Sequence, residues 1–118
     1  LFGTHLAATQ PGDVLVGDRA YADYCVLATL VARGCHFVIR FPRQSFTVVN
    51  AFWAARTQER VVTLVVTSKA RAYVAEHHLP TTLRVRLLKV GLASGEVEVL
   101  GTDLRDAQLY PAAAFKEV

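Results

Sequence analysis

The chain has 118 residues, of which 53% are apolar and 19% charged, and a formal net charge of +3. This size and composition fit one globular domain or part of one, and they exclude a disordered chain. No apolar run approaches the roughly 18–20 residues that a transmembrane helix needs, and the first ten residues lack the basic start of a signal peptide. Cys25 and Cys35 match neither a metal site nor a disulfide framework, which favours reduced thiols in a cytoplasmic protein.

The first third of the chain has the pattern of a strand, a helix and a second strand. Residues 13–18 form a short apolar run after a Pro-Gly break, which predicts a strand buried on both faces. Residues 22–33 carry apolar side chains at helical spacing, with Asp23 as an N-terminal cap and Gly34 at the C-terminal turn. Residues 35–41 read as the second strand. Such short connections predict a βαβ unit with parallel strands.

After Pro42 the pattern becomes that of an antiparallel structure. We expect a short helix near residues 48–53, where Trp53 would belong to the core, and a strand over residues 60–67. A short helix over residues 69–78 would begin after Ser68 as its cap.

Two strands, residues 83–92 and 96–100, flank Ser94-Gly95 and predict a hairpin with a two-residue turn that pairs Val90 with Val99. The alternation of apolar residues changes phase within the first of them, so we expect a bulge near Leu87-Leu88. A further helix is predicted to begin at Pro111.

Asp18 is the first candidate for chemistry, because it directly follows the first strand. In an open α/β sheet, functional groups gather beyond the carboxyl ends of the strands. A carboxylate there can hold a divalent cation such as Mg²⁺, which prefers oxygen ligands. Alternatively, Asp18 caps the next helix or pairs with Arg19. No second acid in the sequence is evidently placed to complete a metal site.

Five basic residues are candidates for contact with the phosphates of an anionic partner such as a nucleic acid. Arg40 and Arg43 lie at the end of the second strand, near Asp18 in a parallel sheet. Arg84, Arg86 and Lys89 lie on the 83–92 strand, where Arg84 and Arg86 alternate with apolar residues and would present a basic face. The alternative is a solvated strand face with cross-strand pairs, for instance between Lys89 and Glu98.

The segment GDRAYADY, its helix and the following HFVIRFPR resemble the second-aspartate region of insertion-sequence DDE transposases, whose catalytic domain has a ribonuclease-H-like core. Asp18 matches the second metal-binding acid of that family and Arg19 the arginine that follows it, whereas Ala20 stands where Gly or Glu is common. LRVRLLKVGLASGEVEVLGTDLRD, followed by LYPAAAFKEV, is similar to the end of the family's β-rich insertion and the approach to its glutamate-bearing helix.

The resemblance implies an α/β fold in three segments. Residues 1–42 would be part of a ribonuclease-H-like core with its second catalytic acid, and residues 43–102 an antiparallel β-rich insertion. Residues 103–118 would return to the core and start the glutamate helix. The first acid would precede Leu1 and the glutamate would follow Val118, so the sequence reads as a piece of a longer chain.

For function, the resemblance implies Mg²⁺- or Mn²⁺-dependent cleavage and strand transfer of transposon-end DNA. The intact protein would be a cytoplasmic bacterial enzyme, nucleoid-associated when bound to DNA, and would act as a homodimer. With Asp18 and Arg19 as its only catalytic residues, this chain would be inactive alone and would bind metal weakly or not at all. Two alternatives stay open: a non-catalytic nucleic-acid-binding remnant of a transposase, and an unrelated α/β nuclease.

Overall fold

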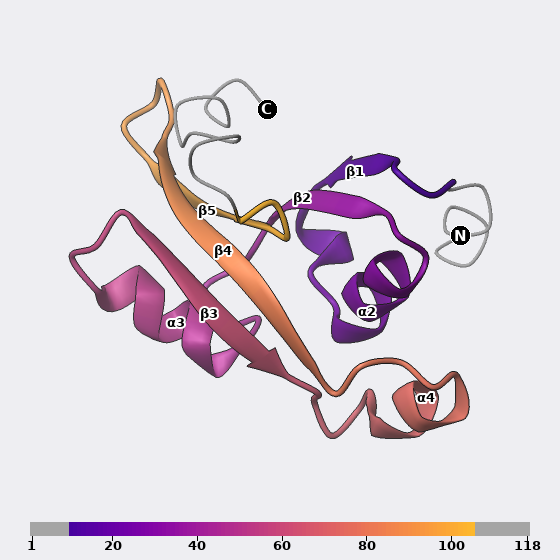
Figure 1. The fold of residues 1–118 in the computed structure, drawn as a ribbon. Coiled ribbons are helices and arrows are strands. Elements are labelled where there is room, and N and C mark those ends of the chain that lie inside the picture. Colours follow the sequence, from indigo (N-terminus) through magenta and orange to yellow (C-terminus); the bar gives the residue numbers. More distant parts are fainter. Residues whose placement is uncertain (1–9, 106–118) are drawn as a thin grey trace.

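A computed structural model describes residues 10–105, which form strands, α-helices and one short 3₁₀ helix (Figure 1). The helix expected from Pro111 lies outside the described residues. In chain order the elements are β1 (Val14–Gly17), the 3₁₀ helix η1 (Arg19–Tyr21), α2 (Tyr24–Ala32), β2 (His36–Arg40), α3 (Thr47–Ala54), β3 (Glu59–Val65), α4 (Arg71–Glu76), β4 (Thr82–Gly91) and β5 (Val97–Thr102).

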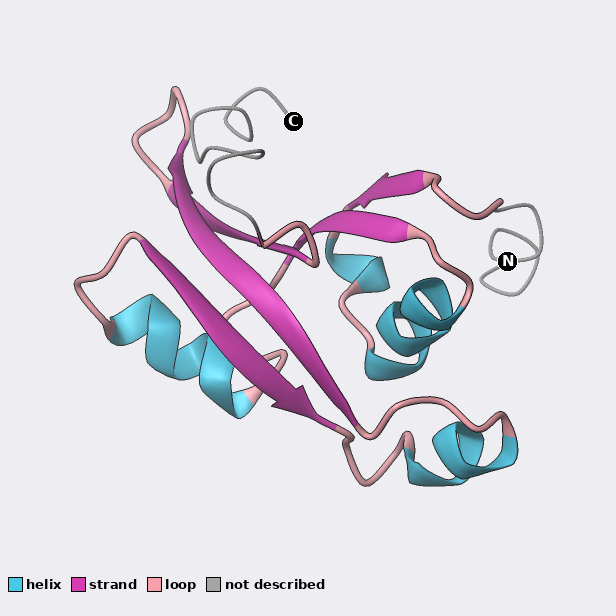
Figure 2. Ribbon diagram, in the orientation of Figure 1, coloured by secondary structure: helices cyan, strands magenta, loops and turns pink. Residues whose placement is uncertain are grey.

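All five described strands join one mixed sheet in the order β1-β2-β5-β4-β3 (Figure 2). Only β1 and β2 are parallel, and the other neighbours run antiparallel. The α/β class predicted from the sequence is therefore confirmed. Because β5 pairs directly with β2, the antiparallel strands continue the parallel pair as one sheet.

The β1–α2–β2 unit forms as its sequence predicts. The Asp23 carboxylate caps α2 by accepting hydrogen bonds from the backbone amides of Cys25 and Val26. Gly34 follows the helix with φ = +73°, a left-handed conformation that favours glycine. The Cys35 amide then donates to the carbonyl of Leu30, which closes the helix with a Schellman-type bond.

The prediction that β1 is buried on both faces is wrong. β1 is an edge strand that pairs only with β2 among the described strands. Val14 is 49% exposed and Val16 59% exposed, whereas Leu15 packs against the main core. The apolar run looked fully buried because the sequence cannot reveal that nothing in residues 10–105 covers one of its faces.

The β4–β5 hairpin forms, but its predicted register is wrong by one residue. Val90 pairs with Glu98, and Val99 with Lys89. The turn has three residues between Leu92 and Glu96, and Gly95 in it has φ = +89°. A three-residue loop that ends on a left-handed glycine is a common hairpin connection.

The bulge expected near Leu87-Leu88 is absent, because β4 pairs without interruption through these residues on both sides. The change of phase has a different cause. Val85 and Leu87 point into the main core, whereas Leu88 and Val90 belong to a small second cluster on the opposite face. One regular strand therefore supplies apolar side chains to two faces of the sheet.

The two faces differ in their cover. The main core joins the sheet to all three described α-helices, which contribute Leu27, Phe52 and Val74 among others. We call the opposite side the open face, because no helix of residues 10–105 packs on it. Its apolar cluster contains Val38, Leu88, Val90 and Leu100, with Leu104 packed against it.

The helices expected after Pro42 are present as α3 and α4. Val49 and Phe52 of α3 are fully buried, as is expected for a helix that packs on a sheet. Ser68 does not cap α4: the helix begins after Ala70, and no side chain caps it.

Candidate functional site

Asp18 lies at the carboxyl end of β1, exposed, on the rim of the sheet. Its Oδ1 accepts a hydrogen bond of 3.0 Å from the backbone amide of Ala20, so it caps η1. The same residue lines a hollow of about 280 Å³ on the open face, together with Val16, Gly17, Val38, Arg40 and Leu100. Asp18 therefore caps the following helix, which was the structural alternative for this residue. It also lies at the end of the first strand, as predicted.

Tyr21 packs close to this strand end. A Cβ atom at Gly17 would lie 2.6 Å from Cδ2 of the Tyr21 ring, so glycine is what allows the ring to approach the backbone beside Asp18. Gly17 is therefore needed for a steric reason, which the sequence alone did not reveal.

Arg40 connects the Asp18 hollow to a second one. It is the last residue of β2 and lines both. Its Nε donates to Glu98 Oε2 at 2.9 Å across the open face, while 47% of the Arg40 side chain stays exposed. The second hollow, of about 190 Å³, is lined by Arg19, Arg40, Phe41, Pro42, Arg43, Trp53 and residues 96–99.

Arg43 and Trp53 meet in this second hollow. The Arg43 guanidinium carbon lies 5.3 Å from the centroid of the Trp53 ring, within the range of a cation–π contact. The prediction that Trp53 is a core residue is correct only in part, because the ring packs on the core and also lines the hollow. The sequence carries no signal for this contact, which arises because α3 lies next to the end of β2.

Arg86 is wrongly predicted as part of an exposed basic face. It is 1% exposed, and its guanidinium is paired with Glu59 and hydrogen-bonded to the carbonyl of Leu104. The strand alternation was read correctly, since Arg84 and Arg86 share the open face, but the pairing with β3 and the chain at Leu104 bury Arg86.

Lys89 does not lie on the same face of the sheet as Arg84 and Arg86. Its position places it on the helix-covered face, where its Nζ donates to the carbonyl of Ala55 and lies 5.1 Å from the centroid of the Phe52 ring. Its ammonium group caps the C-terminal end of α3, which is favourable for a cation. The alternative for Lys89, a cross-strand pair with Glu98, is not formed either, because Glu98 pairs with Arg40.

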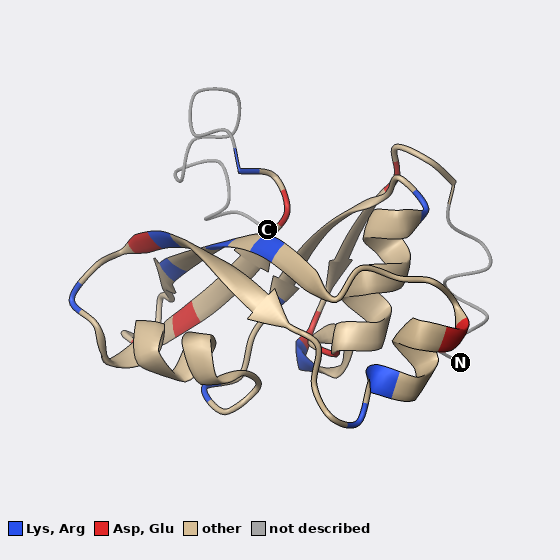
Figure 3. Cartoon of the chain, turned by 60° about the horizontal axis from the view of Figure 1, so that its bottom comes forward, with Lys and Arg blue, Asp and Glu red and all other residues tan. Residues whose placement is uncertain are grey.

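Arg84 is exposed, but it lies apart from Asp18. It lines a hollow with Val31, Thr82, Asp103 and Arg105, among others. Figure 3 shows that Lys and Arg are spread over several elements and not gathered on one strand. The structure therefore brings together Asp18, Arg19, Arg40 and Arg43 of the predicted residues, and not Arg84, Arg86 or Lys89.

The described residues do not form a divalent-metal site by themselves. In residues 10–105 no three His, Cys, Asp or Glu side chains are grouped as metal ligands. Asp18 offers one carboxylate, of which one oxygen already accepts the Ala20 amide. Any metal that bound here would need ligands from outside these residues.

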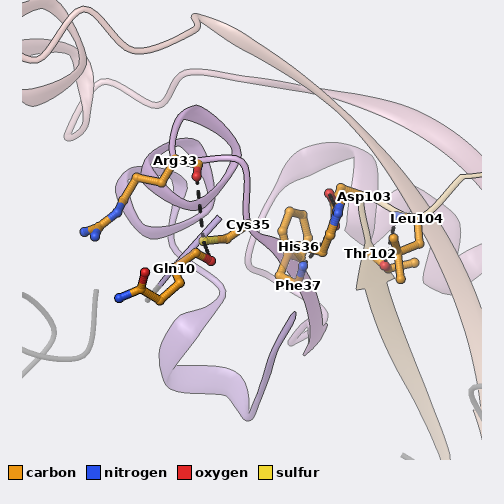
Figure 4. Close-up of polar contacts among 8 residues, drawn as sticks. All are labelled: Gln10, Arg33, Cys35, His36, Phe37, Thr102, Asp103 and Leu104. Carbon is orange, nitrogen blue, oxygen red and sulfur yellow. Dashed lines mark hydrogen bonds and ion pairs between the residues drawn. The ribbon is translucent and has the colours of Figure 1, made fainter. Parts of the chain in front are cut away.

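A polar cluster that sequence reasoning missed lies at the opposite end of β2 (Figure 4). Asp103 accepts a hydrogen bond of 2.9 Å from the Phe37 amide, and its other oxygen lies 2.7 Å from His36 Nδ1. The cluster fixes the chain after β5 against β2. Only the antiparallel pairing of β2 with β5 brings these residues, 67 positions apart, together.

The two cysteines are free thiols, as expected. Cys35 is buried and lies 3.2 Å from the carbonyl of Gln10 (Figure 4). Burial raises the pKa of the Cys25 thiol, and the negative charge of Asp23 adds to this effect. The Cys25 thiol therefore ionises less readily than a free cysteine.

Comparison with protein-family models, with curated proteins and with solved structures found no match for this chain. Within residues 10–105 there is no helix with the length and apolar character required to cross a membrane.

Proposed function

We propose that this chain is part of the catalytic domain of a DDE-type DNA transposase and that the carboxyl ends of β1 and β2 contact DNA. The observation that supports this best is the grouping of Asp18 with Arg19, Arg40 and Arg43 around two hollows that share Arg40. Carboxyl ends of parallel strands are where α/β proteins hold their substrates. The ribonuclease-H-like core and the β-rich insertion belong to the same proposal.

In this proposal Asp18 supplies one of three metal-binding acids, and the other two come from outside residues 10–105. Arg40 and Arg43 neutralise phosphates and position the strand, without reading its sequence. Arg19 directly follows Asp18 in the chain and adds a further positive charge at this end of the sheet. Because residues 10–105 supply only one of the three metal-binding acids of this proposal, the chain on its own should bind DNA but not cleave it.

The test of DNA contact is the salt dependence of binding to a short labelled DNA duplex, followed by fluorescence anisotropy. Each phosphate contact adds about 0.9 to the slope of log K against log salt. Arg40→Gln with Arg43→Gln should lower this slope by about 2, whereas Arg71→Gln, at the exposed start of α4, is the matched control and should leave it unchanged. Equal slopes for all three proteins would contradict the proposal.

A second candidate, a non-catalytic nucleic-acid-binding protein, is favoured by one observation: the Asp18 carboxylate already has a structural role as the cap of η1. The two candidates differ in the effect of Asp18→Asn, because asparagine can still cap the helix but carries no charge. In the transposase proposal, DNA phosphate oxygens complete the weak Mn²⁺ site at Asp18, so Mn²⁺ strengthens DNA binding by the natural chain more than by this variant. In the second, Mn²⁺ acts equally on both.

A further inference from the structure

The hollow of about 190 Å³ beyond β2 differs from the other described cavities in the residues that converge on it. Arg19 comes from the segment after β1, Arg43 from the segment after β2, and Trp53 from α3. Residues 40–42 and 96–99 form the rest of the lining. The volume is large enough for one phosphate group and several waters.

The charges of this hollow favour an anion. Glu98 is already paired with Arg40 at 2.9 Å. No carboxylate of residues 10–105 lies within ion-pair distance of Arg19 or Arg43, so both guanidinium groups keep their hydrogen-bonding capacity for a ligand. Glu96 is exposed and is the one further acid of the lining. A guanidinium presents paired N–H donors that match the oxygens of a phosphate.

Trp53 adds two features that an exposed arginine cluster lacks. Its ring packs against the guanidinium of Arg43, at 5.3 Å from centroid to carbon, and so restricts the orientations of that side chain. Its Nε1 is buried and has no hydrogen-bond partner among the described residues. A buried N–H without an acceptor costs free energy, and a ligand oxygen would recover this cost if the ring turns so that the N–H faces the hollow.

From these observations we infer that the hollow binds a single phosphate group, held by the guanidinium groups of Arg19 and Arg43 and by the indole N–H of Trp53. This inference rests on the proposed function, since it assigns the phosphate to a nucleic-acid strand that passes the end of β2. A free phosphate has the same chemistry, and the experiment separates the two sources. Trp53 is a positioning residue for Arg43 and a donor to the ligand.

The experiment uses the fact that Trp53 is the only tryptophan in the chain, so its fluorescence reports directly on this hollow. The chain is titrated in parallel with inorganic phosphate and with a short DNA oligonucleotide. We expect a saturable change in the emission of Trp53 with both probes, at much lower phosphate concentrations for the oligonucleotide. Arg43→Gln and Arg19→Gln should each weaken binding about tenfold, and Arg71→Gln, which is far from the hollow in sequence and not part of its lining, should not.

A second variant separates the two contributions of Trp53. Trp53→Phe keeps an aromatic ring beneath Arg43 but removes the N–H, so competition against a labelled oligonucleotide should show about fivefold weaker binding. Trp53→Leu removes both features and should weaken binding further. The thermal unfolding of each variant is followed by circular dichroism, so that affinity is compared only between folded proteins.

The outcomes distinguish this inference from the proposed function. If the DNA duplex binds through Arg40 but the emission of Trp53 does not change, or if Trp53→Phe binds as tightly as the natural chain, the phosphate site is refuted and the DNA contact stands. If inorganic phosphate saturates the site and the oligonucleotide does not, the phosphate site is supported and the nucleic-acid assignment is refuted. If neither probe binds, both proposals fail.

Discussion

The buried pair of Arg86 and Glu59 gives the sharpest prediction about stability. Arg86 is 1% exposed, and the Glu59 side chain with which it pairs is 37% exposed. Removing one partner of a buried ion pair costs about 3–5 kcal/mol, because the remaining charge stays buried without compensation. Since water reaches Glu59 and the Leu104 carbonyl also accepts from Arg86, we place the cost of Glu59→Gln below this range, at about 2–3 kcal/mol.

Arg86→Met is the matched variant, because it keeps an unbranched side chain and removes the charge. Replacing a buried charge by an apolar side chain is often close to neutral, so we expect a change within about 1 kcal/mol. The double variant should then be no less stable than Arg86→Met alone, since the amide introduced by Glu59→Gln no longer faces a buried charge.

The assay is urea unfolding followed by circular dichroism, from which the free energy of unfolding of each variant is obtained. The reasoning is refuted if Arg86→Met is less stable than Glu59→Gln, or if Glu59→Gln changes the free energy of unfolding by less than about 0.5 kcal/mol.

Three further predictions concern contacts elsewhere in the fold. A Cβ at Gly101 would lie 2.4 Å from Cε1 of the buried Phe41 ring, so Gly101→Ala should destabilise by about 1–3 kcal/mol in urea, and an unchanged midpoint would contradict this. Burial raises the pKa of Tyr24 from 10.0 to about 12, and its hydroxyl donates to the Pro80 carbonyl. As pH rises, the unfolded chain loses this proton before the folded chain does, so the free energy of unfolding should fall between pH 10 and 12. Tyr24→Phe should remove that part of the pH dependence, and a fall of equal size in the variant would assign it to other groups. Asp103→Ala should cost about 1–3 kcal/mol of stability, because the buried Phe37 amide loses its acceptor. Hydrogen exchange at this amide should then be faster than in the natural chain, and an unchanged rate would show that the bond contributes nothing to stability.

Local signals predicted the local structure well. The Asp23 cap and the left-handed Gly34 mark both ends of α2, because each is satisfied within a few residues of chain. The parallel pairing of β1 with β2 followed from the short connections on either side of that helix.

Features that depend on neighbours distant in sequence were not predictable in this way. The exposure of Val16, the burial of Arg86 and the register of the β4–β5 hairpin all depend on which strand lies alongside and on what covers each face. The same limit applies to the candidate site. The position of Asp18 at a strand end could be read from the sequence, but the contact between Arg43 and Trp53 depends on where α3 packs.

The central claim is that DNA contacts the carboxyl ends of β1 and β2, and the most direct measurement is nuclear magnetic resonance mapping of backbone amides during titration with a short DNA duplex. We expect the largest shifts over residues 17–19 and 40–43, with little change in α4 or at the edge of the sheet formed by β3. Shifts concentrated on α4 or β3, with none at the ends of β1 and β2, would contradict the account.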